Sequence, residues 1–135
     1  MKTVVLVEDD AKIALAFGVR LKSMGYLVHV ARDAISAVAT VRKAQPDVVL
    51  LDISLPGGDG FMVAERLQRL DGCAATPIIF ITASKKPGLR DRAMALGAVG
   101  FLEKPFDATQ LADAIEMALS PGDNWQPNIK ASSGS

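Results

Sequence analysis

The feature that most constrains the fold of this chain is a repeated alternation of short apolar segments with longer amphipathic ones. The apolar segments, rich in β-branched residues, predict strands over residues 3–7, 27–31, 47–52, 77–82 and 99–104. Strands that are apolar on both faces are typical of a parallel sheet covered by helices on both sides. Five such repeats are too few for a closed eight-fold barrel, so we expect an open, doubly wound α/β sheet.

The segments between these strands carry helical periodicity and recognisable helix ends. Ile13, Phe17 and Leu21 recur at near-helical spacing before a glycine at position 25. Asp33 is predicted to cap a second helix, and Asp107 with Gln110 three residues later resembles a capping box. The expected helices end near residues 24, 44, 70, 96 and 119, and residues 56–60 are expected to form a loop.

Length and composition indicate one domain that neither binds nucleic acid directly nor spans a membrane. The chain has 135 residues, half of them hydrophobic, and its 15 basic residues balance its 15 acidic ones. A neutral chain argues against direct nucleic-acid binding, and no apolar run approaches the roughly 20 residues that span a bilayer. The single cysteine and the early acidic residues favour a cytoplasmic location without a signal peptide. We expect a domain over residues 1–120 and a disordered polar tail or linker over 121–135.

Polar side chains end, or directly follow, four of the five predicted strands. The residues at these strand exits are Glu8, Asp9, Asp10, Asp52, Thr82 and Lys104. Ligands of open α/β sheets bind beyond the carboxyl ends of the strands. If the four strands are contiguous, these side chains converge on one site at that edge of the sheet.

Four motifs in this order resemble those of the receiver domains of two-component response regulators. They are "VEDD", "VVLLDISLPGGDG", "IIFITA" and "FLEKPF", and the resemblance covers residues 2–119. It implies a flavodoxin-like (βα)5 three-layer sandwich with parallel strand order 2-1-3-4-5. It also implies a role in phosphorelay signal transduction.

The resemblance assigns a metal-dependent phosphoacceptor site. Asp52 matches the phosphoacceptor and Asp9 the direct metal ligand, whereas Glu8 would act through water or hydrogen bonds. The backbone carbonyl of Ser54 would complete the protein ligands. Carboxylate and carbonyl oxygens suit Mg²⁺, which Mn²⁺ could replace, and the sequence has no Cys/His cluster for zinc. The simpler interpretation of these acids is helix and turn capping.

Four further residues match the family pattern near the last two strands. Lys104 would contact Asp52 or the phosphoryl group, and Thr82 would donate a hydrogen bond to a phosphoryl oxygen. The bond before Pro105 matches a cis peptide, and Phe101 matches an aromatic switch position. Lys104, Thr82 and Phe101 each have a plainer interpretation: an exposed lysine, a β-branched strand residue, and a half-buried aromatic ring, respectively.

The implied function is a signalling switch with self-catalysed aspartyl phosphorylation and dephosphorylation, not a metabolic enzyme. The donor would be a histidine kinase or a histidine phosphotransfer protein. The face formed by the fourth helix, fifth strand and fifth helix would contact a downstream protein or output domain. A phosphorylation-dependent homodimer is a further candidate partner, and the sequence does not assign it a face. The alternatives are a phosphorylation-independent binding module of the same fold, a haloacid-dehalogenase-type phosphatase, and a flavodoxin-type cofactor carrier. The last two fit poorly, because the first strand lacks both DxD and a phosphate-cradling loop.

Overall fold

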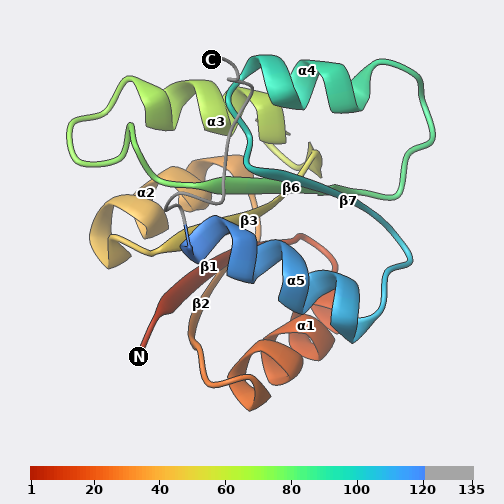
Figure 1. The fold of residues 1–135 in the computed structure, drawn as a ribbon. Helices are drawn as coiled ribbons and strands as arrows, with labels where there is room; N and C mark the ends of the chain where they lie inside the picture. Colours follow the sequence, from red (N-terminus) through yellow and green to blue (C-terminus); the bar gives the residue numbers. More distant parts are fainter. Residues whose placement is uncertain (121–135) are drawn as a thin grey trace.

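The computed structural model describes residues 1–120, which form a five-stranded parallel sheet between two layers of helices (Figure 1). The strands of this sheet are β1 (Thr3–Val7), β2 (Leu27–Ala31), β3 (Val48–Asp52), β6 (Ile78–Thr82) and β7 (Gly100–Glu103). Their order is β2-β1-β3-β6-β7, and every neighbouring pair is parallel. This confirms the flavodoxin-like fold, with β6 and β7 as the fourth and fifth strands of the expected 2-1-3-4-5 order.

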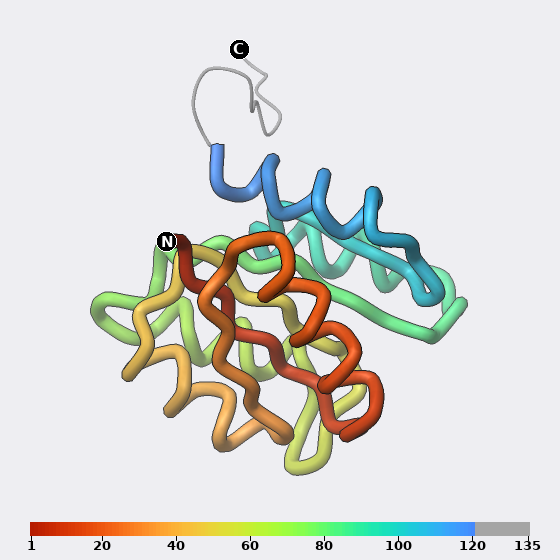
Figure 2. Tube along the Cα trace, turned by 90° about the horizontal axis from the view of Figure 1, so that it is seen from below, coloured from red at the N-terminus to blue at the C-terminus, as the bar shows by residue number. Residues whose placement is uncertain are grey.

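The helices are divided between the two faces of the sheet. They are α1 (Ala11–Ser23), α2 (Ala34–Ala44), α3 (Gly60–Gln68), α4 (Leu89–Ala95) and α5 (Ala108–Leu119). Buried residues of α1 and α5 share one hydrophobic cluster, and those of α2, α3 and α4 share the other. In Figure 1 the sheet lies between these layers, and Figure 2 looks onto the face that α1 and α5 cover.

The central strands show why the sequence lacks polar alternation. Val4 and Leu6 pack toward α1 and α5, whereas Val5 and Val7 pack toward the other layer. All four side chains are fully buried. Burying such a side chain contributes about 1.5–3 kcal/mol, so both faces of the strand stabilise the fold.

The predicted helix caps are present. The Asp33 carboxylate accepts a hydrogen bond from the Ser36 N–H at 2.7 Å, and Asp107 forms the complete capping box with Gln110. These caps satisfy backbone N–H groups that have no partner within the first helical turn. Within residues 1–120, the helices are too short or too polar to cross a membrane.

The segment before α3 differs from the loop expected over residues 56–60. Two short antiparallel strands, β4 (Ser54–Leu55) and β5 (Gly58–Asp59), form a hairpin there. Gly57 and Gly58 have φ values of 80° and 146°, which allow this tight turn. The helix then begins at Gly60 and ends at Gln68, so the expected end near residue 70 was too late. The expected tail over 121–135 lies outside the described residues.

Candidate functional site

The carboxyl ends of the parallel strands bring together the residues of the site. Asp52 is the last residue of β3, and Glu8 directly follows the neighbouring strand β1. Thr82 ends β6, and Lys104 directly follows β7. Because β1, β3, β6 and β7 are contiguous, these residues share one edge of the sheet.

Asp52 is held by two hydrogen bonds in a nearly closed environment. Its residue surface is 5% exposed. Oδ1 accepts the backbone N–H of Ser54 at 3.0 Å, and Oδ2 accepts a hydrogen bond from Lys104 Nζ at 2.8 Å. The carboxylate is therefore fixed in orientation, with one positive charge beside it.

Lys104 also donates to Glu8, with 2.6 Å between Nζ and Oε1. Burial raises the pKa of Glu8, although the hydrogen bond from Lys104 partly opposes this effect. Burial alone would lower the pKa of Lys104, but its hydrogen bonds to Asp52 and Glu8 outweigh burial and raise it. Lys104 thus stays protonated and bridges the ends of β1 and β3. The direct contact between Lys104 and Glu8 was not predicted from the sequence.

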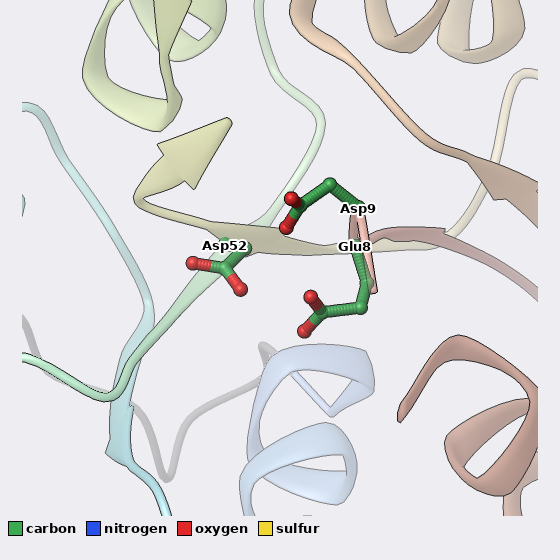
Figure 3. Close-up of side chains that lie close together, drawn as sticks. All are labelled: Glu8, Asp9 and Asp52. Atoms are coloured by element: carbon green, nitrogen blue, oxygen red, sulfur yellow. The ribbon is translucent and has the colours of Figure 1, made fainter. Parts of the chain in front are cut away.

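Three carboxylates gather at this edge in a way that fits a hard cation. One oxygen each from Glu8, Asp9 and Asp52 lies within 4.8 Å of the others, and Figure 3 shows the three side chains around one space. Glu8 and Asp52 are buried, whereas Asp9 is exposed. Carboxylate oxygens arranged in this way suit Mg²⁺, which binds few protein ligands and keeps several waters.

Asp10 has a different task from the neighbouring acids. Its Oδ1 accepts the N–H groups of Lys12 and Ile13 at 2.9 and 3.0 Å and caps α1. The hydrogen bond from the Ile13 N–H is the main cause that lowers the pKa of Asp10. The capping interpretation is therefore correct for this third acid.

Thr82 and Phe101 lie on the two strands beyond Asp52. Thr82 is 1% exposed; its Oγ accepts the Ser84 N–H at 3.0 Å, and its carbonyl accepts the Lys104 N–H at 2.8 Å. The Phe101 ring is buried, and the Arg90 guanidinium lies 5.0 Å from its centroid. The bond between Lys104 and Pro105 is cis.

Gly60 is a residue of this region that sequence reasoning left as part of a loop. A Cβ atom at this position would lie 2.4 Å from the Asp52 carbonyl oxygen and 3.0 Å from Ile53 Cα. The N–H of Gly60 also donates to the Ile53 carbonyl at 2.7 Å. The only sign of this role in the sequence is that Gly60 follows Asp59, the residue that caps α3. The sequence does not reveal that Gly60 approaches the backbone of Asp52 and Ile53.

Fold and site together define a doubly wound α/β domain with acids, a threonine and a lysine at one end of its sheet. The chain belongs to the family of response regulator receiver domains, whose family model matches residues 4–116. It is 33% identical over 129 residues to the phosphate regulon transcriptional regulatory protein PhoB of Pseudomonas aeruginosa, covering 93% of this chain and 56% of that protein. It is 33% identical over 120 residues to the transcriptional regulatory protein PdtaR of Mycobacterium tuberculosis, covering 88% and 57%.

Solved structures agree with this assignment. The chemotaxis protein CheY4 of Vibrio cholerae superposes with a TM-score of 0.82 at 30% identity, covering 88% of this chain and 99% of that one. The signal receiver domain of a modulated diguanylate cyclase from Desulfovibrio desulfuricans gives 0.79 at 37% identity, covering 90% and 95%. The chain spans only 49–60% of the length of its curated relatives, several of them transcriptional regulators.

Proposed function

We propose that Asp52 accepts a phosphoryl group from a histidine kinase or a histidine phosphotransfer protein. The observation that carries the proposal is the fixed, buried Asp52 carboxylate, with the Lys104 ammonium 2.8 Å away and two more carboxylates beside it. An enclosed carboxylate with a neutralising cation is suited to nucleophilic attack on phosphorus. The same site would return the protein to its resting state by hydrolysis.

In the proposed reaction, one Asp52 oxygen attacks the phosphorus of phosphohistidine. A P–O bond forms, the P–N bond breaks, and the imidazole leaves and takes up a proton from solvent. Lys104 would shift from Asp52 toward a phosphoryl oxygen and offset its negative charge. Thr82 Oγ accepts from Ser84, so its own hydroxyl proton is available for another phosphoryl oxygen. Attack of water on phosphorus would then release inorganic phosphate and restore Asp52.

Asp9, Asp52 and the Ser54 carbonyl would hold Mg²⁺, with Glu8 acting through water. When bound, the cation supplies positive charge where negative charge builds up on the phosphoryl oxygens. The fit rests on the hard oxygen donors and on the carboxylate oxygens of Glu8, Asp9 and Asp52, which lie within 4.8 Å of one another. Mn²⁺ prefers similar donors and would substitute.

A groove beside the site offers a docking surface for the donor protein. It has a volume of about 380 Å³ and is lined by apolar and basic residues of α1 (Lys12, Ile13, Ala16, Phe17 and Arg20) and by Lys104, Pro105 and Phe106. The rings of Phe17 and Phe106, which both line the groove, lie 5.1 Å apart. Because Lys104 borders the groove and also contacts Asp52, a helix seated here would bring a histidine to the phosphoacceptor.

The output of the switch would lie on the face formed by α4, β7 and α5. Phe101 is buried there beneath Arg90, which provides one discrete arrangement that phosphorylation of Asp52 would bias. The proposed binding partners are a downstream protein, an output domain, or a second phosphorylated copy of the chain.

Intact-mass measurement after incubation with acetyl phosphate and MgCl₂ tests the proposal. We expect a gain of one phosphoryl group, roughly 80 Da, which is absent in Asp52→Asn and with EDTA. Asp71→Asn, an exposed aspartate outside the site, is the matched control and should gain the same mass. If the wild-type mass stays unchanged and beryllofluoride leaves the NMR signals of Phe101 unaltered, the chain is a phosphorylation-independent binding module.

A further inference from the structure

One segment of the chain carries a concentrated positive charge. The segment 11–46, which contains α1, β2 and α2, has six basic residues, Lys12, Arg20, Lys22, Arg32, Arg42 and Lys43, against one acid, Asp33. That acid is engaged in capping α2. Because the whole chain is neutral, this segment holds five positive charges in excess and the rest of the chain five negative ones. A surface of this kind attracts acidic partners.

The same segment contains an exposed edge of the sheet. Among the described residues, β2 pairs with β1 on one side and with no strand on the other. The Leu27 N–H donates to Lys2, and the Ala31 carbonyl accepts from Glu8, so alternate residues of β2 face β1. The N–H and carbonyl groups of Val28 and Val30 therefore point away from the sheet. Such groups are a template for an added strand.

Two grooves flank this edge. The groove on the α1 side, about 240 Å³, has mainly apolar walls that include Leu15, Val19 and Val30, with the basic residues Lys22 and Arg32 among its lining. Leu15 and Val19 are 69% and 61% exposed, although they are large apolar side chains. The groove on the α2 side, about 540 Å³, is lined by His29, Thr40 and Lys43 together with Val30 and Ala44, and Lys43 is its one basic residue. The residues that line either groove include no acid.

We propose that the β2 edge binds an extended, acidic segment of another protein, which adds to the sheet as a sixth strand. Because successive side chains of a strand point to opposite faces, the ligand would alternate apolar residues facing α1 with acidic residues facing α2. Main-chain hydrogen bonds to Val28 and Val30 supply affinity, and Lys43 selects the acidic residues. A second copy bound through the same face is disfavoured, since it would bring two positive surfaces together.

Fluorescence anisotropy with a labelled peptide of alternating valine and glutamate tests this proposal on the full chain. We expect saturable binding that weakens with salt, and chemical-shift changes at the Val28 and Val30 amides. Lys43→Glu and Leu15→Asp should each weaken binding about fivefold or more. Arg42→Glu, an exposed basic residue of α2 outside the grooves, should change it less than about twofold. No saturation up to about 1 mM peptide, or equal binding by Lys43→Glu and wild type, would overturn the proposal.

Control peptides separate strand addition from charge attraction alone. A peptide of the same composition with its valines and glutamates in two blocks, and one with a central proline, should bind about fivefold more weakly. Equal affinity for a valine–lysine peptide would contradict the proposal. A dimer in sedimentation that Leu15→Asp abolishes would assign the edge to a second copy instead. Preferential binding to phosphatidylserine vesicles over the valine–glutamate peptide would assign it to a lipid surface.

Discussion

Lys104 Nζ lies 2.8 Å from Asp52 Oδ2, and the same ammonium lies 2.6 Å from Glu8 Oε1. One positive charge from the end of β7 thus serves two buried carboxylates from the ends of β1 and β3. Asp9 adds a third carboxylate within 4.8 Å, so the site keeps a surplus of negative charge. Two carboxylates about 4 Å apart repel by about 4 kcal/mol in a partly buried setting. This surplus of negative charge favours the binding of a cation beside Glu8 and Asp9.

Replacing Lys104 with methionine should destabilise the protein in the absence of divalent cations. The change keeps much of the apolar side chain but leaves Glu8 and Asp52 without their shared donor. We expect a loss of about 1–3 kcal/mol in the free energy of unfolding, measured by urea denaturation in EDTA. Adding Mg²⁺ should stabilise Lys104→Met more than wild type, because the cation then supplies the missing charge.

Lys86→Met is the matched control, since Lys86 is exposed and outside the site. Its unfolding free energy should stay within about 0.5 kcal/mol of wild type with and without Mg²⁺. If Lys104→Met and Lys86→Met behave alike in EDTA, the Lys104 contacts contribute nothing to stability.

Gly60→Ala should disturb the site without altering any of its acids. The new Cβ would lie 2.4 Å from the Asp52 carbonyl oxygen, and this neighbour is backbone that cannot rotate away. We expect a destabilisation of about 1–3 kcal/mol and slower phosphorylation by acetyl phosphate. Gly18→Ala in α1 is the control, because no atom lies within 4 Å of its added Cβ. The Gly18→Ala variant should be neutral or stabilising by up to about 1 kcal/mol. If Gly60→Ala is tolerated equally well, the backbone of Gly60 does not pack tightly against the Asp52 carbonyl.

The sequence predicted the sheet well because its strands are apolar on both faces. Val4 to Val7 are fully buried, and strands that are apolar on both faces are typical of a parallel sheet covered by helices on both sides. The caps at Asp33 and Asp107 were predictable for a similar reason, since their signals are local. Strand order came from the family resemblance, because periodicity carries no information on which strands are neighbours.

The remaining differences depend on long-range contacts that local patterns do not encode. The β4–β5 hairpin is set by two glycine conformations and by the close approach of the Met62 side chain of α3 to Gly58. The Lys104–Glu8 contact joins residues 96 positions apart, so its geometry appears only after β1, β3 and β7 are assembled. Burial in that assembly also raises the pKa of Glu8, an effect invisible in the motif "VEDD".

The raised pKa of Glu8 predicts a pH-dependent stability difference between wild type and Glu8→Gln. With its folded pKa above the unfolded value of about 4.3, the native state binds more protons between these two values. The stabilisation that protonated Glu8 gives to the native state is therefore fully present below about pH 4 and is lost as the pH rises through the folded pKa. In EDTA, wild type should gain stability relative to Glu8→Gln as the pH falls from about 8 to about 5. The unfolding free energy of wild type minus that of Glu8→Gln should therefore become more positive.

Glu65→Gln provides the reference for this measurement, because Glu65 is an exposed residue of α3. Urea denaturation at each pH should show a nearly constant difference between wild type and this variant. A Glu8→Gln difference that is equally flat would contradict the assignment of a raised pKa to Glu8.

The contact of Arg90 with Phe101 predicts a measurable coupling on the α4–β7–α5 face. The guanidinium carbon lies 5.0 Å from the centroid of the buried ring, and such cation–π contacts are worth about 0.5–1 kcal/mol at exposed sites. A double-mutant cycle with Arg90→Gln and Phe101→Leu should give a coupling free energy in that range. The matched cycle pairs Arg90→Gln with Phe61→Leu, whose ring contacts Arg92 instead, and should give a coupling near zero. If both cycles agree, Arg90 does not hold the Phe101 ring, and α4 lacks the specific link to β7 that the proposed switch requires.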